Sequence, residues 1–148
     1  MLGTEALAGA QIGADLANER GGVLGQTIVL DTADATSPAI ATNEARRLIN
    51  RSGLKLLVGA YGSSISLAIA AAANQLKVPY FEGAAVADDL TQRGYRYVFR
   101  LNDNANAMAA AQVQGGRGDV RPQNRQAAWP AQDRGHSRGW CVRYQHRP

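Results

Sequence analysis

The apolar positions of the first two thirds of the chain fall into short runs, separated by longer segments with helical spacing. The runs are rich in β-branched and aromatic residues and are bounded by glycine, proline or polar residues, which is typical of strands. They read "QTIVLD" at 26–31, "KLLVGA" at 55–60, "VPYFEG" at 78–83 and "YRYVFRL" at 95–101. We therefore predict four strands over these ranges.

The segments around these runs predict helices, because their apolar residues recur on one side. The predicted helices cover residues 4–20, 38–52, 63–76 and 86–94, and a further helix begins at 104. Gly21 and Gly53 suit the helix ends that they follow, and Pro38 suits a first helical turn. The apolar stripes of the first two helices consist of Leu7, Ala10, Ala14 and Leu16, and of Ala41, Ala45, Leu48 and Ile49.

Strands that alternate with helices at this spacing predict an α/β fold, in which a parallel sheet is covered by helices on both faces. The crossovers between parallel strands are then right-handed. In such three-layer folds, ligands bind beyond the carboxyl ends of the strands. Those ends lie at residues 31–34, 61–64, 82–86 and 101–104.

Residues 112–148 differ in composition from the rest of the chain. They contain both Trp, both His and the only Cys, but no Lys, Leu, Ile, Phe or Met. Their seven Arg and two Asp give a net charge of +5, whereas residues 1–111 carry nine Lys and Arg against ten Asp and Glu. A nucleic-acid groove would distribute its positive charge over several folded elements. We therefore expect no nucleic-acid partner for the body.

We expect this Arg- and Gly-rich tail to be disordered, since it shows no helical or strand period. Three interpretations of this tail stay open. The first is a solvated tail without a role, and the second is an RNA-binding arm in which Trp129 and Trp140 stack on bases. The third is a segment translated out of frame from a GC-rich gene. The single Cys141 excludes an internal disulfide. No apolar run is long enough to span a membrane.

The main candidate site is the break "YGSS" at 61–64, between a predicted strand and a predicted helix. Ser63 or Ser64 could simply cap the helix. The same geometry suits an anion, because a helix N-terminus offers free amides and the positive end of the dipole. Gly62 would then allow close approach of the backbone, the serines would hold a carboxylate or small phosphate, and Tyr61 would pack over the ligand.

Catalytic interpretations have less support. A serine nucleophile needs a base, and residues 1–111 contain no His. Asp88 and Asp89 do not face each other on a helix, so we interpret them as charges at its N-terminus. Asp31 and Asp34 are weak indications of a metal site. We expect no catalytic residue, no metal and no cofactor.

A dinucleotide site is the remaining enzymatic alternative. Gly59 and Gly62 follow a strand, and Glu82 ends the next strand, where a ribose-binding acid belongs. The spacing lacks the third glycine of that motif. This interpretation would make the protein a nicotinamide-dependent oxidoreductase.

Three stretches of the chain resemble a known family: "GAQIGADLANERGGVLGQTIVL", "NEARRLINRSGLKLLVGAYGSS" and "KVPYFEGAAVADDLTQRGYRYVFRL". In order and spacing they look like the N-terminal lobe of type I periplasmic solute-binding proteins. The most similar group is the receptors of ABC transporters for branched-chain amino acids and amides. The resemblance covers residues 3 to about 111. It implies a non-enzymatic, two-lobed clamshell that closes on a small amino acid-like ligand and works with an ABC permease.

The resemblance also implies binding residues. The family serine that holds the α-carboxylate of the ligand corresponds to Ser63, with Ser64 beside it. The next loop of the family contacts the ligand through a backbone carbonyl and a hydroxyl, at positions that resemble Ala84 and Val86. Val86 has no hydroxyl, so the ligand stays open among amino acids, amides and other small carboxylates. An aromatic residue of the first loop corresponds to Leu2.

Three features of the family are not recognised in this sequence. The signal peptide and first strand are not found, so the periplasmic location of the intact family is not encoded here and the chain as written would be cytoplasmic. The first strand lies between the strands at 26–31 and 55–60, which should therefore have unpaired edges. The second lobe is also missing, so we expect residues 1–111 to form an incomplete lobe. The functional alternative is a ligand-sensing regulator with the same clamshell.

Overall fold

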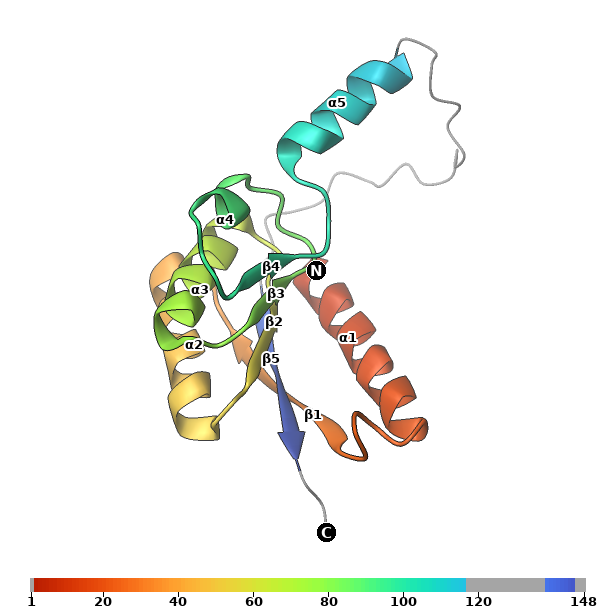
Figure 1. The fold of residues 1–148 in the computed structure, drawn as a ribbon, viewed down its shortest axis with the longest axis vertical. Coiled ribbons are helices and arrows are strands. Elements are labelled where there is room, and N and C mark those ends of the chain that lie inside the picture. Colours follow the sequence, from red (N-terminus) through yellow and green to blue (C-terminus); the bar gives the residue numbers. More distant parts are fainter. Residues whose placement is uncertain (1, 117–137, 146–148) are drawn as a thin grey trace.

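The computed structural model describes residues 2–116 and 138–145, with the backbone alone for Leu2, Ser52, residues 115–116 and residues 138–145. Strands and helices alternate as predicted, and they form one sheet with flanking helices (Figure 1). The strands are β1 Thr27–Asp34, β2 Leu56–Gly59, β3 Tyr80–Glu82, β4 Val98–Arg100 and β5 Arg138–Gln145. The helices are α1 Leu2–Glu19, α2 Pro38–Ser52, α3 Ser63–Leu76, α4 Asp89–Gln92 and α5 Ala105–Gly116.

The sheet has the strand order β1-β5-β2-β3-β4. The pairs β2–β3 and β3–β4 are parallel, as the alternating pattern predicts. Strand β5 is antiparallel to both of its neighbours, with Val142 opposite Leu30 on one side and Leu56 on the other. Because β1 and β2 both run opposite to β5, they are parallel to each other.

Strand β5 occupies the position between β1 and β2 that the family resemblance leaves without a strand. The unpaired edges expected there are therefore not found. The structure also differs from the expected disordered tail over residues 138–145, which form this strand, and at the end of α5. Residues 117–137, with Trp129, lie outside the described residues, and Trp140 is described only by its backbone in β5.

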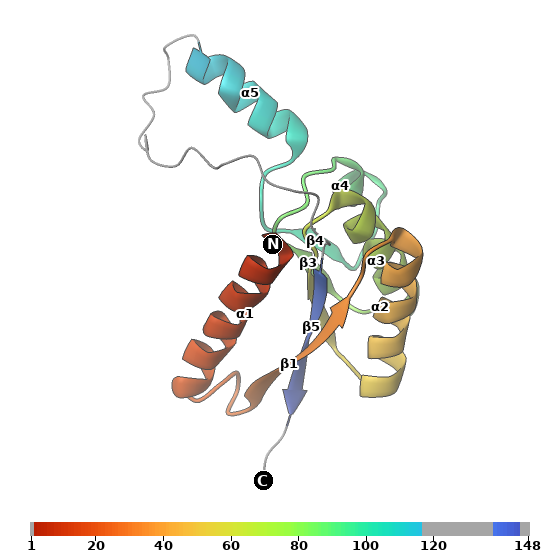
Figure 2. The ribbon, with the colours of Figure 1, turned by 180° about the vertical axis from the view of Figure 1, so that it is seen from behind.

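The helices lie on both faces of the sheet (Figures 1 and 2). Helix α1 covers one face over β1 and β5, while α2, α3 and α4 cover the other. Helix α5 projects beyond the sheet, and its side chains at 105–114 are exposed. Phe81 and Phe99 stack with their ring centroids 5.0 Å apart. Since Phe81 alternates with two residues that face α3, this stack lies on the α1 face of the sheet.

The hydrophobic core lies between the sheet and helices α2 and α3. Ala70 and Ala73 of α3 are fully buried, and their small side chains let this helix pack close to the strands. The predicted stripe of α2 is confirmed at its buried positions Ala41, Ala45 and Leu48. The stripe predicted for 4–20 is wrong at Leu16, which is 47% exposed because it follows the buried Ala14 by two positions and therefore points to the opposite side of the helix.

Local signals placed the limits of α2 correctly. The Ser37 hydroxyl accepts a hydrogen bond from the Ile40 amide, Pro38 stands in the first turn, and Gly53 adopts the left-handed conformation that ends the helix (φ 61°). By contrast, β1 is longer than predicted. It continues through Asp34, so residues 32–34, the first part of the segment interpreted as a loop, belong to the strand.

Candidate functional site

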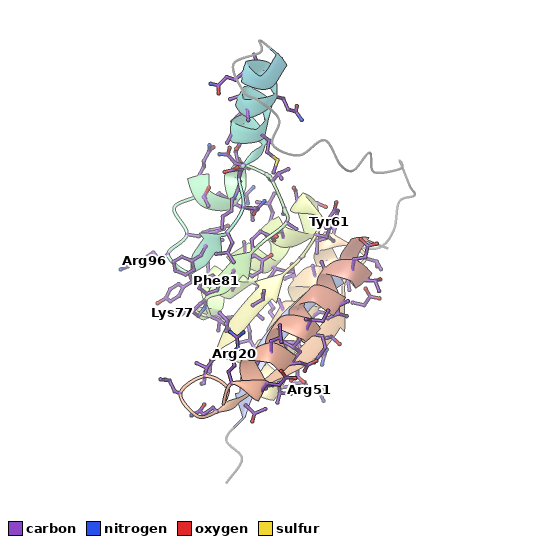
Figure 3. The ribbon with its side chains drawn as sticks, turned by 90° about the vertical axis from the view of Figure 1, so that its right-hand side faces the viewer. Arg20, Arg51, Tyr61, Lys77, Phe81 and Arg96 are labelled. Atoms are coloured by element: carbon purple, nitrogen blue, oxygen red, sulfur yellow. The ribbon has the colours of Figure 1, made fainter. Side chains whose placement is uncertain are left out.

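The predicted binding residues lie at the carboxyl ends of β2 and β3, on the β2–α3 turn and the β3–α4 loop. On the turn, Tyr61 is 41% exposed, Ser63 is half-buried and Ser64 is exposed. On the loop, Ala84 and Val86 are half-buried. Because β2 and β3 are paired and parallel, the turn and the loop are neighbours at one end of the sheet. Figure 3 shows Tyr61 at this end.

The N-terminus of α3 has no side-chain cap. Gly62 is the N-cap residue in an extended conformation (φ −83°, ψ 132°), and no side chain accepts a hydrogen bond from the first turn. The simpler role considered for these serines, that Ser63 or Ser64 caps the helix, is therefore wrong. The amides at the start of α3 point out of the helix at its positive end, where Ser64 is open to solvent.

Among the described residues, two backbone acceptors of the β3–α4 loop have no partner, the carbonyls of Gly83 and Ala84. The Val86 carbonyl accepts from the Ala105 amide at 2.8 Å, and the Ala85 carbonyl accepts from the Asn102 side chain at 3.3 Å. Within the described residues, no donor lies on the Ala84 carbonyl. Of the two loop positions predicted to bind the ligand, Ala84 and Val86, Ala84 is thus the one whose carbonyl is available.

A buried carboxylate lies behind these two loops. Glu82 is 0% exposed, and its Oε2 accepts a hydrogen bond from the Ala60 amide at 3.2 Å and from the Tyr80 hydroxyl at 2.5 Å. The Ser66 hydroxyl of α3 also donates to this oxygen and lies 2.7 Å from the Tyr80 hydroxyl. A buried charge is tolerated when donors surround it in this way.

The second oxygen of Glu82 binds the neighbouring loop. Its Oε1 accepts from the Ala84 amide at 2.7 Å and from the Ala85 amide at 2.8 Å. Burial and the adjacent Glu82 carboxylate raise the pKa of Tyr80 well above its ordinary value, so this hydroxyl keeps its proton and stays a donor. The carboxylate therefore touches both loops of the candidate site.

The sequence interpretation missed this cluster. It considered Glu82 only as a ribose-binding acid, and that role is wrong for this structure because the side chain has no exposed surface and both oxygens are occupied. One signal was available in the sequence. Tyr80 and Glu82 are two residues apart in a strand and share a face, and a polar pair on the buried face of a strand requires partners.

The adjacent carboxylates Asp88 and Asp89 do not act as a pair. Asp89 forms an exposed ion pair with Arg93 at 3.0 Å, and Asp88 accepts from the Asn106 side chain at 2.7 Å. These adjacent carboxylates point to different partners, as the helical interpretation predicts.

Asp31 and Asp34 lie on β1. In the parts of the chain that the structure describes, no group of three metal-ligating side chains is found. A helix that could cross a bilayer is also lacking among residues 2–116, the part that contains the helices described here.

The chain matches the protein family described as "Periplasmic binding protein" over residues 1–120. It is 41% identical over 113 residues to "Leu/Ile/Val-binding protein homolog 8" of Brucella abortus, and 38% identical over 109 residues to "Leu/Ile/Val-binding protein homolog 7" of Brucella suis. The first match covers 76% of this chain and the second 74%. The chain spans only 28% and 27% of the length of these relatives.

Solved structures show the same likeness. The branched-chain amino acid transporter substrate-binding protein LivJ of Streptococcus pneumoniae, solved with isoleucine, is 30% identical, with a TM-score of 0.65 over 69% of this chain and 29% of its own. An ABC transporter substrate-binding protein of Desulfitobacterium hafniense is 25% identical, with a TM-score of 0.69 over 76% of this chain and 34% of its own.

Proposed function

Because the chain belongs to the periplasmic binding protein family, whose members bind solutes and are not enzymes, we propose that residues 1–111 form the N-terminal lobe of a solute-binding protein. Its ligand is a branched-chain amino acid, an amide or a similar small carboxylate. In this proposal residues 112–148 are a segment of different composition that supplies strand β5 to the sheet of the lobe. The intact protein works in the periplasm and delivers its ligand to an ABC permease.

The observation that carries the proposal is the open, uncapped N-terminus of α3. The amides of Ser63 and Ser64, with their hydroxyls, suit the α-carboxylate of the ligand, because the dipole of α3 favours an anion there. Ser66, one turn further on, is buried and bound to Glu82, so it is not part of this contact. The exposed Tyr61 packs beside the ligand.

The β3–α4 loop supplies the complementary contact. The unpartnered Ala84 carbonyl accepts from the α-amino group of the ligand, and Val86 gives an apolar contact in place of a hydroxyl. The isoleucine complex of the pneumococcal relative supports a ligand with both groups. Since the chain spans about 28% of the length of its relatives, we expect the 148-residue chain alone to bind in the millimolar range, or about 4 kcal/mol.

The test is an NMR titration of the ¹⁵N-labelled chain with isoleucine and with isoleucinamide, which has no carboxylate. Isoleucine should shift the amide signals of Ser63, Ser64 and Ile65, and isoleucinamide should leave them in place. Micromolar binding of isoleucine by the same chain in a calorimeter would contradict the half-site that we propose.

Two substitutions of Ser63 distinguish the contribution of its backbone amide to binding from that of its hydroxyl. Ser63→Pro removes the amide at a position where proline is tolerated, because it is the first helical residue and Gly62 already has the extended conformation that precedes proline. We expect Ser63→Pro to abolish the isoleucine shifts at Ser64 and Ile65, and Ser63→Ala to weaken binding about threefold to tenfold. Unchanged affinity in both variants would show that the carboxylate binds elsewhere.

The transport role has a simple genetic test. A full-length gene next to permease and ATPase genes would support delivery to a transporter. Fusion to a DNA-binding or kinase segment would instead support the ligand-sensing regulator.

A further inference from the structure

The two loops of the candidate site belong to different strand–helix units but meet at one side chain. Glu82 ends β3, and its Oε2 reaches back to the Ala60 amide of the β2–α3 turn. Its Oε1 binds the Ala84 and Ala85 amides of the β3–α4 loop. We propose that Glu82 is a positioning residue, which fixes the Ala84 carbonyl in the direction that recognises the amino group of the ligand. This inference rests on the proposed function.

The direction of the carbonyl follows from the geometry of one peptide bond. The Ala84 carbonyl and the Ala85 amide belong to the same peptide, which is trans. In a trans peptide the C=O and N–H bonds point in opposite directions. Because the Ala85 N–H points at Glu82, the Ala84 carbonyl points away from the buried cluster, and it has no partner among the described residues. The same geometry at the Ala84 N–H turns the Gly83 carbonyl away from the cluster, so Glu82 orients both peptides of this loop.

The chemistry of the cluster requires a carboxylate. All the groups around Glu82 are hydrogen-bond donors: the amides of Ala60, Ala84 and Ala85 and the hydroxyls of Ser66 and Tyr80. An ionised carboxylate is an acceptor only, with two oxygens that can serve these groups together. A glutamine of the same shape would direct its amino group at donors on one of the two sides. An apolar side chain could fill the space but could not orient a backbone amide.

The same bonds link the carbonyl to the anion-binding turn. Ser66 belongs to the first turns of α3, whose N-terminus is the proposed carboxylate site, and it donates to the same oxygen as Tyr80. The side chain of Glu82 therefore connects the start of α3 to the Ala84 peptide. This connection fixes the distance between the site for the carboxylate of the ligand and the site for its amino group.

The experiment compares two ligands that differ only in the amino group, isoleucine and 3-methylpentanoate. Both are titrated into the ¹⁵N-labelled 148-residue chain, its Glu82→Gln variant and a Glu44→Gln control, which makes the same chemical change in an exposed ion pair of α2. In the unmodified chain, isoleucine should bind roughly tenfold more tightly, as expected for a hydrogen bond to a charged group. In Glu82→Gln this preference should fall to nearly one, while Glu44→Gln should keep it.

If Glu82 had a merely structural role, Glu82→Gln would weaken the binding of both ligands equally and leave the ratio of their affinities unchanged. A ratio in Glu82→Gln within twofold of that in the unmodified chain overturns the inference, while the Ser63 to Ile65 shifts still support the proposed function. If neither ligand shifts those amides in the unmodified chain, the proposed function fails, and Glu82 has no ligand group to position.

Tyr80→Phe keeps the test decisive if Glu82→Gln does not fold. This variant retains the carboxylate and removes one donor from Oε2. We expect it to shift the Ala84 and Ala85 amide signals, which the Tyr80 hydroxyl does not touch, and to lower the preference for isoleucine about threefold. Unmoved loop signals and an unchanged preference would show that Glu82 does not couple the two loops.

Discussion

At the scale of single residues, the buried Tyr80 hydroxyl leads us to predict how the stability of the fold depends on pH. Burial, and then the Glu82 carboxylate, raise its pKa well above the usual value near 10. The folded chain therefore keeps a proton that the unfolded chain loses above about pH 10. The resulting stability is complete below that pH and is lost as the pH rises toward the folded-state pKa, by up to about 1.4 kcal/mol per pH unit.

Urea denaturation between pH 9 and pH 11 checks this prediction. The free energy of unfolding should fall more steeply in the unmodified chain than in Tyr80→Phe, which lacks the titrating group. The comparison cancels the effect of lysines and of the other tyrosines. Equal slopes in the two proteins would show that the Tyr80 hydroxyl is not held in its neutral form by the fold.

The same scale shows what the sequence could and could not indicate about the site. The turn at 61–64 was found because a glycine and two serines between a strand and a helix have few structural uses. The role of Glu82 could not be found, because the alternation of a strand says only that Tyr80 and Glu82 share a face. That two loops converge on that face depends on how separate strands pair.

At the scale of elements, the connection between α1 and β1 depends on one glycine. Gly22 has φ +72°, and a Cβ placed on it would lie 1.9 Å from the Gln26 carbonyl oxygen. Val23 and Gln26 exchange two backbone hydrogen bonds in this turn, so the oxygen has little freedom to move. Gly21 also has a positive φ (+96°) but open space around its Cβ position.

We expect Gly22→Ala to destabilise the chain by about 2 kcal/mol or more, and Gly21→Ala by about 1 kcal/mol, which represents the backbone strain alone. Thermal or urea denaturation of the two variants measures the difference. Equal losses would indicate that the turn relaxes around the added methyl group.

Element limits could be predicted where local chemistry marks them. Pro38 and Gly53 bracket α2, and the helical run at 63–76 begins and ends where its sequence indicates. Strand β5 was not predicted, although Trp140, Val142 and Tyr144 recur at every second position as in a strand, because the Arg- and Gly-rich composition of the whole segment 112–148 indicated disorder. The position of β5 depends on the backbone N–H and C=O groups of β1 and β2, which need hydrogen-bond partners. The sequences of β1 and β2 do not indicate which segment supplies those partners.

At the scale of the whole molecule, β5 joins β1 to the three parallel strands. Val142 stands at the centre of this junction, opposite both Leu30 and Leu56. Val142→Pro removes a ladder donor from the interior of the sheet, where an unsatisfied group costs about 1–3 kcal/mol, whereas Val142→Ala keeps the backbone intact.

We therefore expect Val142→Pro to lower the midpoint of urea unfolding and to speed amide exchange in β1 and β2, relative to Val142→Ala. Hydrogen exchange followed by NMR resolves the two strands. If both variants protect the amides of β1 and β2 equally, β5 does not hold the sheet together.

The direction and position of β5 also determine when the sheet can be completed during synthesis. β1 ends at Asp34 and β2 at Gly59, but the segment that lies between them begins only at Arg138. A nascent chain therefore has two open strand edges until residues 138–145 have been made, and closing so long a loop is slow. The growing polypeptide depends during that interval on chaperones, or on dilution, to avoid edge-to-edge aggregation.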